Sequence, residues 1–99
     1  MRPSDITAPI VHATTLITNA LKQGLFVILN LHHFDQFTSN PTAHTNQFFA
    51  IWRQLGKHYA AAHPGLALEL LNEPKDAATT EVMNPIYAET IKIIHGFNP

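Results

Sequence analysis

Two short apolar runs stand out among longer segments in which apolar residues recur every three or four positions. The runs are "LFVILNL" at residues 25–31 and "LALELLN" at residues 66–72. Neither run shows a clean alternation of apolar and polar positions, which is typical of strands buried on both faces of a parallel sheet. We therefore predict two buried strands.

Three segments have the apolar spacing of amphipathic helices. The first covers residues 4–24, with Ser4 and Asp5 as candidate capping residues and Gly24 at its end. The second runs from about residue 45 to 62, and the third from about 81 to 95. The predicted inward-facing residues are Ile10, Ala13, Thr14, Ile17, Ala20 and Leu21 in the first, Phe48, Ile51, Trp52, Leu55, Tyr59 and Ala62 in the second, and Val82, Ile86, Ala88, Ile91 and Ile94 in the third.

The order helix, strand, helix, strand, helix predicts an α/β fold with two parallel strands joined through a right-handed crossover. Polar connections follow each strand, "FDQFTSNPTAH" after the first and "NEPKDAATTEVMN" after the second. Two strands leave open edges and uncovered faces, so other strands or a partner should complete the sheet. The chain therefore looks like part of a larger α/β domain.

Composition excludes several classes of partner. Of the 99 residues, 45% are hydrophobic and 13% charged, which is typical of a globular chain. A net charge of -1 gives no electrostatic footprint for nucleic acid or an anionic membrane. The longest apolar run is too short to cross a membrane, and the first residues lack the apolar core of a signal peptide. Without cysteine, the chain has no disulfide and no thiolate metal site.

Polar side chains follow both predicted strands at the point where each strand ends. His32 and His33 come after the first strand, and Asn72 and Glu73 after the second. In parallel α/β folds, the carboxyl ends of the strands carry the active site, because the loops converge there. We therefore expect these four residues to share one edge of the sheet.

Glu73 is the candidate for acid chemistry. A carboxyl at such an edge becomes a general acid when apolar walls or a second negative charge raise its pKa, and glycoside hydrolysis uses a pair of carboxyls in this way. The competing interpretation is a capping or loop-ordering acid at the surface. Asn72 and Pro74 favour the catalytic interpretation, because an amide can bind a sugar hydroxyl and a proline fixes the turn away from the strand.

Other polar residues fit structural roles better. His32 and His33 are neighbours on a strand and should point to opposite faces, so they are a poor metal pair, and the sequence has no HExxH motif. We predict no metal site. Glu69 precedes Glu73 by four residues on the same strand face, which predicts a buried, paired structural acid rather than a second catalytic carboxylate.

The aromatic residues divide into two groups. Phe48, Trp52 and Tyr59 recur with helical spacing, which favours core packing over sugar stacking. Phe34, Asp35 and Phe37 follow the histidines, and they are candidates for lining a substrate cleft.

Two segments together resemble glycoside hydrolase family 5, the family of many cellulases and related β-glycanases. They are "GLFVILNLHH" and "FFAIWRQLGKHYAAAHPGLALELLNEP", and the resemblance extends from about Pro9 to Pro99. It implies that the fold is a fragment of a (β/α)8 TIM barrel. Residues 1–99 would then be a partial catalytic domain, from about the second helix of the barrel to the fourth, with "GFNP" resembling the turn into the fifth strand.

The resemblance also implies roles for the residues at the strand ends. Members of the family are retaining enzymes with two catalytic glutamates. Glu73 matches the general acid/base, and Asn72 matches the amide that contacts the sugar beside the scissile bond. His32 matches the active-site histidine after the third strand, and His33 the second histidine of members that have a pair. The nucleophile at the end of the seventh strand has no counterpart here, so we expect this chain alone to be inactive.

The resulting hypothesis is an endo-β-1,4-glucanase-like enzyme that hydrolyses β-linked polysaccharides such as β-glucan. The other barrel segments of this complete enzyme would belong to the same full-length chain. Neither a metal nor an organic cofactor is needed. Many members of the family are secreted, although no signal segment is visible here. One alternative is a non-catalytic βα module that binds sugar or protein, and another is an isolated chain that aggregates without folding. The linkage cleaved is left open.

Overall fold

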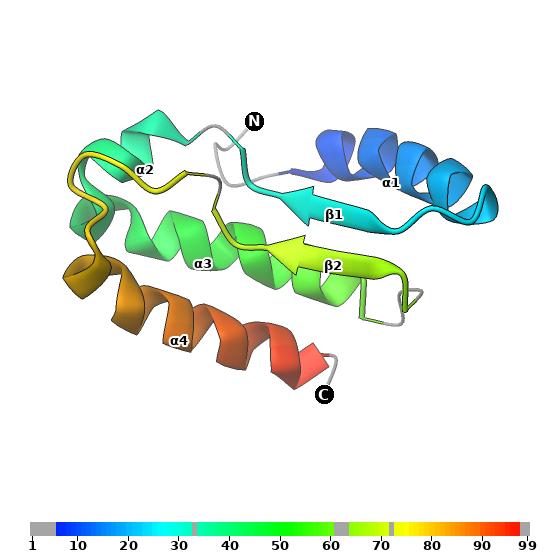
Figure 1. Ribbon diagram of the computed structural model, residues 1–99. Helices are drawn as coiled ribbons and strands as arrows, with labels where there is room; N and C mark the ends of the chain where they lie inside the picture. The colour runs from blue at the N-terminus through cyan, green and yellow to red at the C-terminus, as the bar shows by residue number, and fades with distance from the viewer. Residues whose placement is uncertain (1–5, 33, 61–63, 72, 98–99) are drawn as a thin grey trace.

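The computed structural model describes residues 6–32, 34–60, 64–71 and 73–97. Two parallel strands lie side by side, with helices packed behind and beside them (Figure 1). The carboxyl ends of both strands point toward a short helix and the long loop before the last helix (Figure 1). In chain order the elements are α1 (Thr7–Lys22), β1 (Val27–Asn30), α2 (Asp35–Ser39), α3 (Pro41–His58), β2 (Leu66–Glu69) and α4 (Thr80–Phe97).

The parallel pairing is confirmed, with a register that runs from Val27 opposite Leu66 to Asn30 opposite Glu69. Both strands are shorter than predicted. One helix was missed, because the five residues of α2 are too few to show a helical period in the sequence. Helix α3 begins at Pro41, four residues earlier than predicted, since proline is well suited to the first turn of a helix.

The ends of α1 agree in part with the prediction. Gly24, at φ 80°, lies just beyond the helix, and its N–H donates to the Leu21 carbonyl at 3.0 Å. The candidate capping residues Ser4 and Asp5 lie outside the described residues. At the start of the helix, Ile6 has no side-chain capping bond, and its own N–H donates to Gln54 Oε1 at 3.3 Å.

The core surrounds the inner side of α3, which packs against the strands, α2 and α4, and the core residues predicted for α3 are confirmed. Phe48 and Trp52 have no exposed surface, and Ala62 lies outside the described residues. The prediction for α4 is wrong at Ala88 and Ile91, which are exposed. Apolar residues occur on more than one side of this helix. The side that packs against α3, and is therefore buried, carries Met83, Ile86 and Thr90. The Thr90 hydroxyl is satisfied within its own helix, donating to the Ile86 carbonyl at 2.7 Å.

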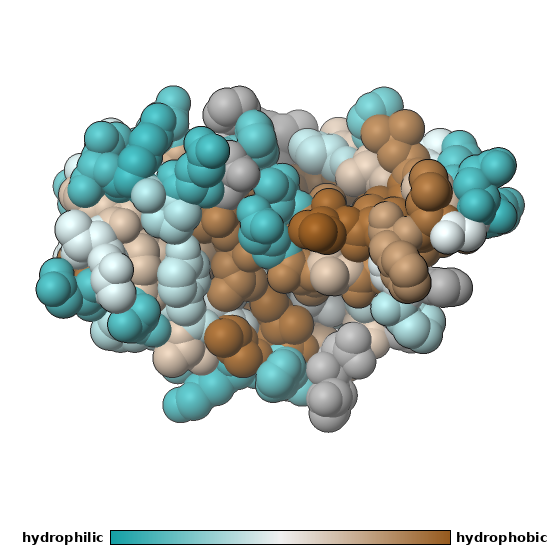
Figure 2. All heavy atoms as spheres, in the orientation of Figure 1, coloured by the Kyte–Doolittle hydropathy of each residue, from teal (hydrophilic) through white to brown (hydrophobic). Residues whose placement is uncertain are grey.

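One face of the sheet is not covered by the described helices, so the prediction of strands buried on both faces is wrong for this chain. Val27, Leu29, Leu66 and Leu68 are partly buried against the helices. On the other face, Ile28 is 68% exposed. Figure 2 shows hydrophobic side chains gathered over the two strands on this open face.

Candidate active site

The site begins where β2 ends. Trp52, buried on α3, donates its indole N–H to the carbonyl of Leu70 at 3.0 Å. The next side chain, Leu71, is buried in the core. Asn72 lies outside the described residues, and the chain then turns at Glu73. The end of β2 is thus fixed to α3 immediately before the candidate acid.

Glu73 has an unusual backbone conformation and an exposed side chain. Its φ is 45°, in the left-handed region that residues other than glycine rarely adopt. Such a conformation costs on the order of 1 to 3 kcal/mol and persists where the surrounding structure enforces it, which is frequently at functional sites. The strain therefore supports a functional interpretation of this turn.

His32 and Glu73 line the same pocket, which has a volume of about 320 Å³. His32 comes from the end of β1 and Glu73 from the end of β2, so the parallel pairing brings the two residues to one edge, as expected. His33, the other predicted histidine, lies outside the described residues together with Asn72. The remaining lining residues are Phe34, Asp35, Thr38, Leu71 and Lys75.

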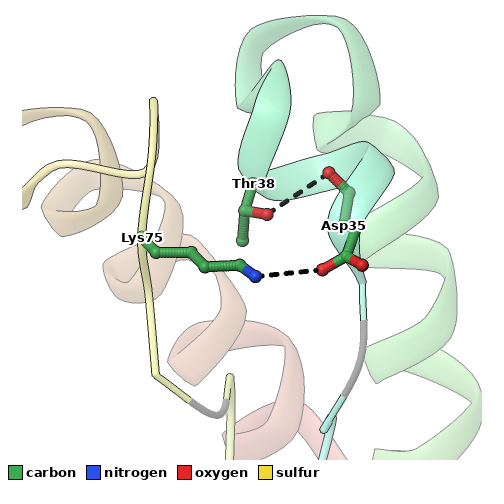
Figure 3. Close-up of polar contacts among 3 residues, drawn as sticks. All are labelled: Asp35, Thr38 and Lys75. Carbon is green, nitrogen blue, oxygen red and sulfur yellow. Dashed lines mark hydrogen bonds and ion pairs between the residues drawn. The ribbon is translucent and has the colours of Figure 1, made fainter.

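A contact between α2 and the loop after Glu73 lies along one wall of the pocket (Figure 3). Lys75 Nζ lies 3.5 Å from Asp35 Oδ1, and the Thr38 hydroxyl donates to the Asp35 carbonyl at 3.2 Å. Both charged side chains are largely exposed, so this ion pair stabilises the fold by less than about 1 kcal/mol. A backbone bond from the Ala77 N–H to the Thr38 carbonyl, 3.0 Å long, joins the same two segments. The loop after Glu73 is therefore tied to α2.

Two of the three candidate cleft residues line the pocket. Phe34 and Asp35 line the pocket, whereas Phe37 does not. Phe37 has no exposed surface, and its ring stacks on Phe48 with centroids 4.7 Å apart. Lys75 also lines the pocket, although it was not a predicted site residue. Its place two positions after Glu73 is the one signal in the sequence that could have indicated it.

In the part of the chain that the structure describes, no group of three or more His, Cys, Asp or Glu side chains could hold a metal ion. Among the described helices, none has both the length and the apolar character needed to cross a membrane.

Glu69 is paired as predicted, but it is exposed rather than buried. Asn30 Nδ2 on β1 donates to Glu69 Oε1 at 3.3 Å. The carboxylate is exposed because it lies on the open face of the sheet, at the end of β2. The charge of Glu69 also acts on Tyr87 of α4. The pKa of Tyr87 is raised above its usual value of 10.0, mainly by burial and to a smaller extent by the negative charge of Glu69.

We expect Glu69→Gln to lower the pKa of Tyr87, because the substitution removes one of the two causes that raise it. Absorbance of tyrosinate against pH, in a Tyr59→Phe background, measures Tyr87 alone, since the sequence has two tyrosines. Because the pKa of Tyr87 is raised in the folded state, its contribution to the free energy of unfolding is complete below pH 10.0. This contribution declines as the pH rises through the folded-state pKa. Glu89→Gln, at an exposed position on α4, is the matched control and should leave the titration unchanged.

Comparison with known proteins gives one family and a set of similar structures. The model of the cellulase family, glycosyl hydrolase family 5, matches residues 8–99. The endoglucanase Cel5A from the hyperthermophile Thermotoga maritima is 31% identical, with a TM-score of 0.90 over 94% of this chain and 30% of that one. The cellulose synthase subunit Z of Clostridioides difficile is 36% identical, with a TM-score of 0.88 over 91% of this chain and 30% of that one.

A third structure, Thermotoga maritima Cel5A in complex with mannotriose, is 32% identical, with a TM-score of 0.85 over 88% of this chain and 28% of that one. Among curated proteins, none matches this sequence significantly. The chain thus spans about 30% of the length of the similar structures.

Proposed function

The chain belongs to the cellulase family, glycosyl hydrolase family 5, and we propose that it supplies the general acid/base of a longer β-glycan hydrolase. The observation that carries this proposal is the pocket shared by His32 and Glu73 at the carboxyl ends of two parallel strands. The similar endoglucanase structures are about three times as long as the matched part, which supports residues 1–99 being a partial catalytic domain.

In the proposed mechanism, Glu73 gives its proton to the glycosidic oxygen as the bond to the sugar breaks. A second carboxylate, from a segment outside this sequence, forms a glycosyl-enzyme with the sugar. Glu73 then takes a proton from the water that hydrolyses this intermediate. In retaining enzymes the two carboxyl groups lie about 5 to 5.5 Å apart, so the second should enter the pocket beside Glu73.

The other polar residues would bind sugar. His32 lines the pocket and can hydrogen-bond a hydroxyl of the substrate. The family resemblance assigns Asn72 to the sugar bound next to the scissile bond, and His33 to the second histidine of members that have a pair. No cofactor is needed, because proton transfer and the second carboxylate complete the reaction.

The substrate class we propose is a β-linked polysaccharide such as β-glucan. One similar structure is Thermotoga maritima Cel5A in complex with cellobiose, and another is the same enzyme with mannotriose. These ligands support glucan and mannan chains as candidates for the complete enzyme.

A direct test compares the purified 99-residue chain with the complete enzyme on a soluble mixed-linkage β-glucan. Reducing ends should be released by the complete enzyme and not by the isolated chain, which lacks the nucleophile. Release by the isolated chain that Glu73→Gln abolishes would contradict this expectation. Another carboxylate of this chain, or one of a second copy, would then have to act as the nucleophile.

A non-catalytic sugar-binding module is the second candidate. It is favoured by the composition of the pocket, where aromatic Phe34 and the polar side chains of Asp35 and Lys75 accompany a single glutamate. Calorimetric titration of the isolated chain with cellotetraose distinguishes the two. Affinity that is unaffected by Glu73→Gln, together with no turnover by the complete enzyme, would favour simple binding.

A further inference from the structure

Two buried residues of α3 hold the two ends of the loop that carries Glu73. Phe48 and Trp52 are four positions apart, so they lie one above the other on the same face of the helix, and neither has any exposed surface. We propose that Trp52 is a positioning residue for Glu73 and that Phe48 supports the same loop from its other end. This inference rests on the proposed role of Glu73 as the general acid/base.

The first anchor lies before Glu73. The indole N–H of Trp52 donates to the carbonyl of Leu70 at 3.0 Å. Leu70 is partly buried and lies one residue beyond β2 and three before Glu73. Because the indole ring is enclosed in the core, the position of this carbonyl is fixed relative to α3.

The second anchor lies after Glu73 and acts through α2. Phe37 of α2 stacks on Phe48, with an angle of 20° between the rings. The next residue, Thr38, is 3% exposed, and its carbonyl accepts the Ala77 N–H at 3.0 Å. The loop is therefore held at Leu70 and again at Ala77.

Between these anchors, Glu73 keeps its left-handed φ of 45°. A strained conformation of this kind persists when its surroundings leave no relaxed alternative. Without the Trp52 bond, the segment from Leu70 to Glu73 gains freedom to relax, and the carboxyl group moves with it. A general acid has to lie about 2.6 to 3.2 Å from the oxygen it protonates, and a shift of about 1 Å can cost up to about 10²-fold in rate.

The test uses Trp52→Phe in the complete enzyme, which keeps an aromatic ring but removes the N–H donor. Tyr59→Phe is the matched control, because it removes a buried hydroxyl that lies 3.0 Å from Thr14 Oγ1. Tyr59 follows Trp52 in the chain by about two helical turns. Each variant is assayed on β-glucan, whose leaving oxygen must be protonated, and on 2,4-dinitrophenyl β-cellobioside, whose leaving group departs without a proton.

For Trp52→Phe we expect kcat/KM on β-glucan to fall by about tenfold or more, and kcat/KM on the dinitrophenyl substrate to stay within about twofold. Tyr59→Phe should leave the ratio of the two values unchanged. Equal losses on both substrates would overturn the proposal, since they would mean that Trp52 has a general structural role. Unchanged rates on both would overturn it as well.

A second measurement does not depend on activity. Amide hydrogen exchange of residues 70–77 in the complete protein should be faster in Trp52→Phe than in Tyr59→Phe, and equal exchange would overturn the proposal. A wrong assignment of Glu73 would be recognised by a different result. Glu73→Gln would then leave β-glucan turnover unchanged, independently of the effect of Trp52→Phe on hydrogen exchange.

Discussion

Replacing Glu73 with glutamine in the complete enzyme should lower turnover of β-glucan by about 10² or more, because a positioned general acid/base contributes about 10² to 10⁴ to the rate. Glutamine has nearly the same size and can form hydrogen bonds, but it carries no proton that it can transfer to the leaving oxygen. The side chain is exposed, so the substitution should have little effect on folding. Reducing-end release under saturating substrate measures the loss.

Glu81→Gln is the matched control for this experiment. Glu81 is an exposed acid in the first turn of α4, away from the residues that line the pocket with His32. Its substitution should leave turnover unchanged. The assignment of Glu73 would fail if both variants kept normal activity, or if both lost it to the same extent.

The sequence predicted the main elements because their signals are local. The apolar runs that became β1 and β2 and the periodic segments that became α1, α3 and α4 each contain enough residues to show their pattern. The predicted fold class, part of a (β/α)8 barrel, is confirmed by the similarity to family 5 enzymes. The errors at Ala88 and Ile91 came from α4, where apolar residues occur on several sides and tertiary packing selects one of them.

The candidate site was predictable only as far as topology determines it. Parallel strands bring their carboxyl ends together, which is why His32 and Glu73 could be expected at one edge. The left-handed backbone of Glu73 and the Ala77 to Thr38 bond could not be predicted, because they depend on how α2 and α3 pack. The helix α2 itself left no periodic signal, although it holds one side of the pocket.

The open face of the sheet connects the fold to the proposed longer enzyme. Ile28 points to this face at the middle of β1, opposite the exposed Ala67 of β2. Ile28 is 68% exposed, and hydrophobic side chains gather over the two strands on this face (Figure 2). A contiguous exposed apolar patch of this kind marks a surface that another part of a protein covers. In a closed barrel, residues on this side of the strands fill the interior. Ile28 should therefore be a core residue of the complete enzyme.

Ile28→Ala should consequently destabilise the complete protein by about 2 to 5 kcal/mol, the usual cost of truncating a buried isoleucine. Leu16→Ala is the matched control, because Leu16 is also exposed here, by 58%, but lies on α1. Its cost should stay within about 0.5 kcal/mol. Denaturant unfolding of both variants gives the free energies. If Ile28→Ala costs no more than Leu16→Ala, the open face stays open in the complete protein, and the proposal that further barrel strands close over it is wrong.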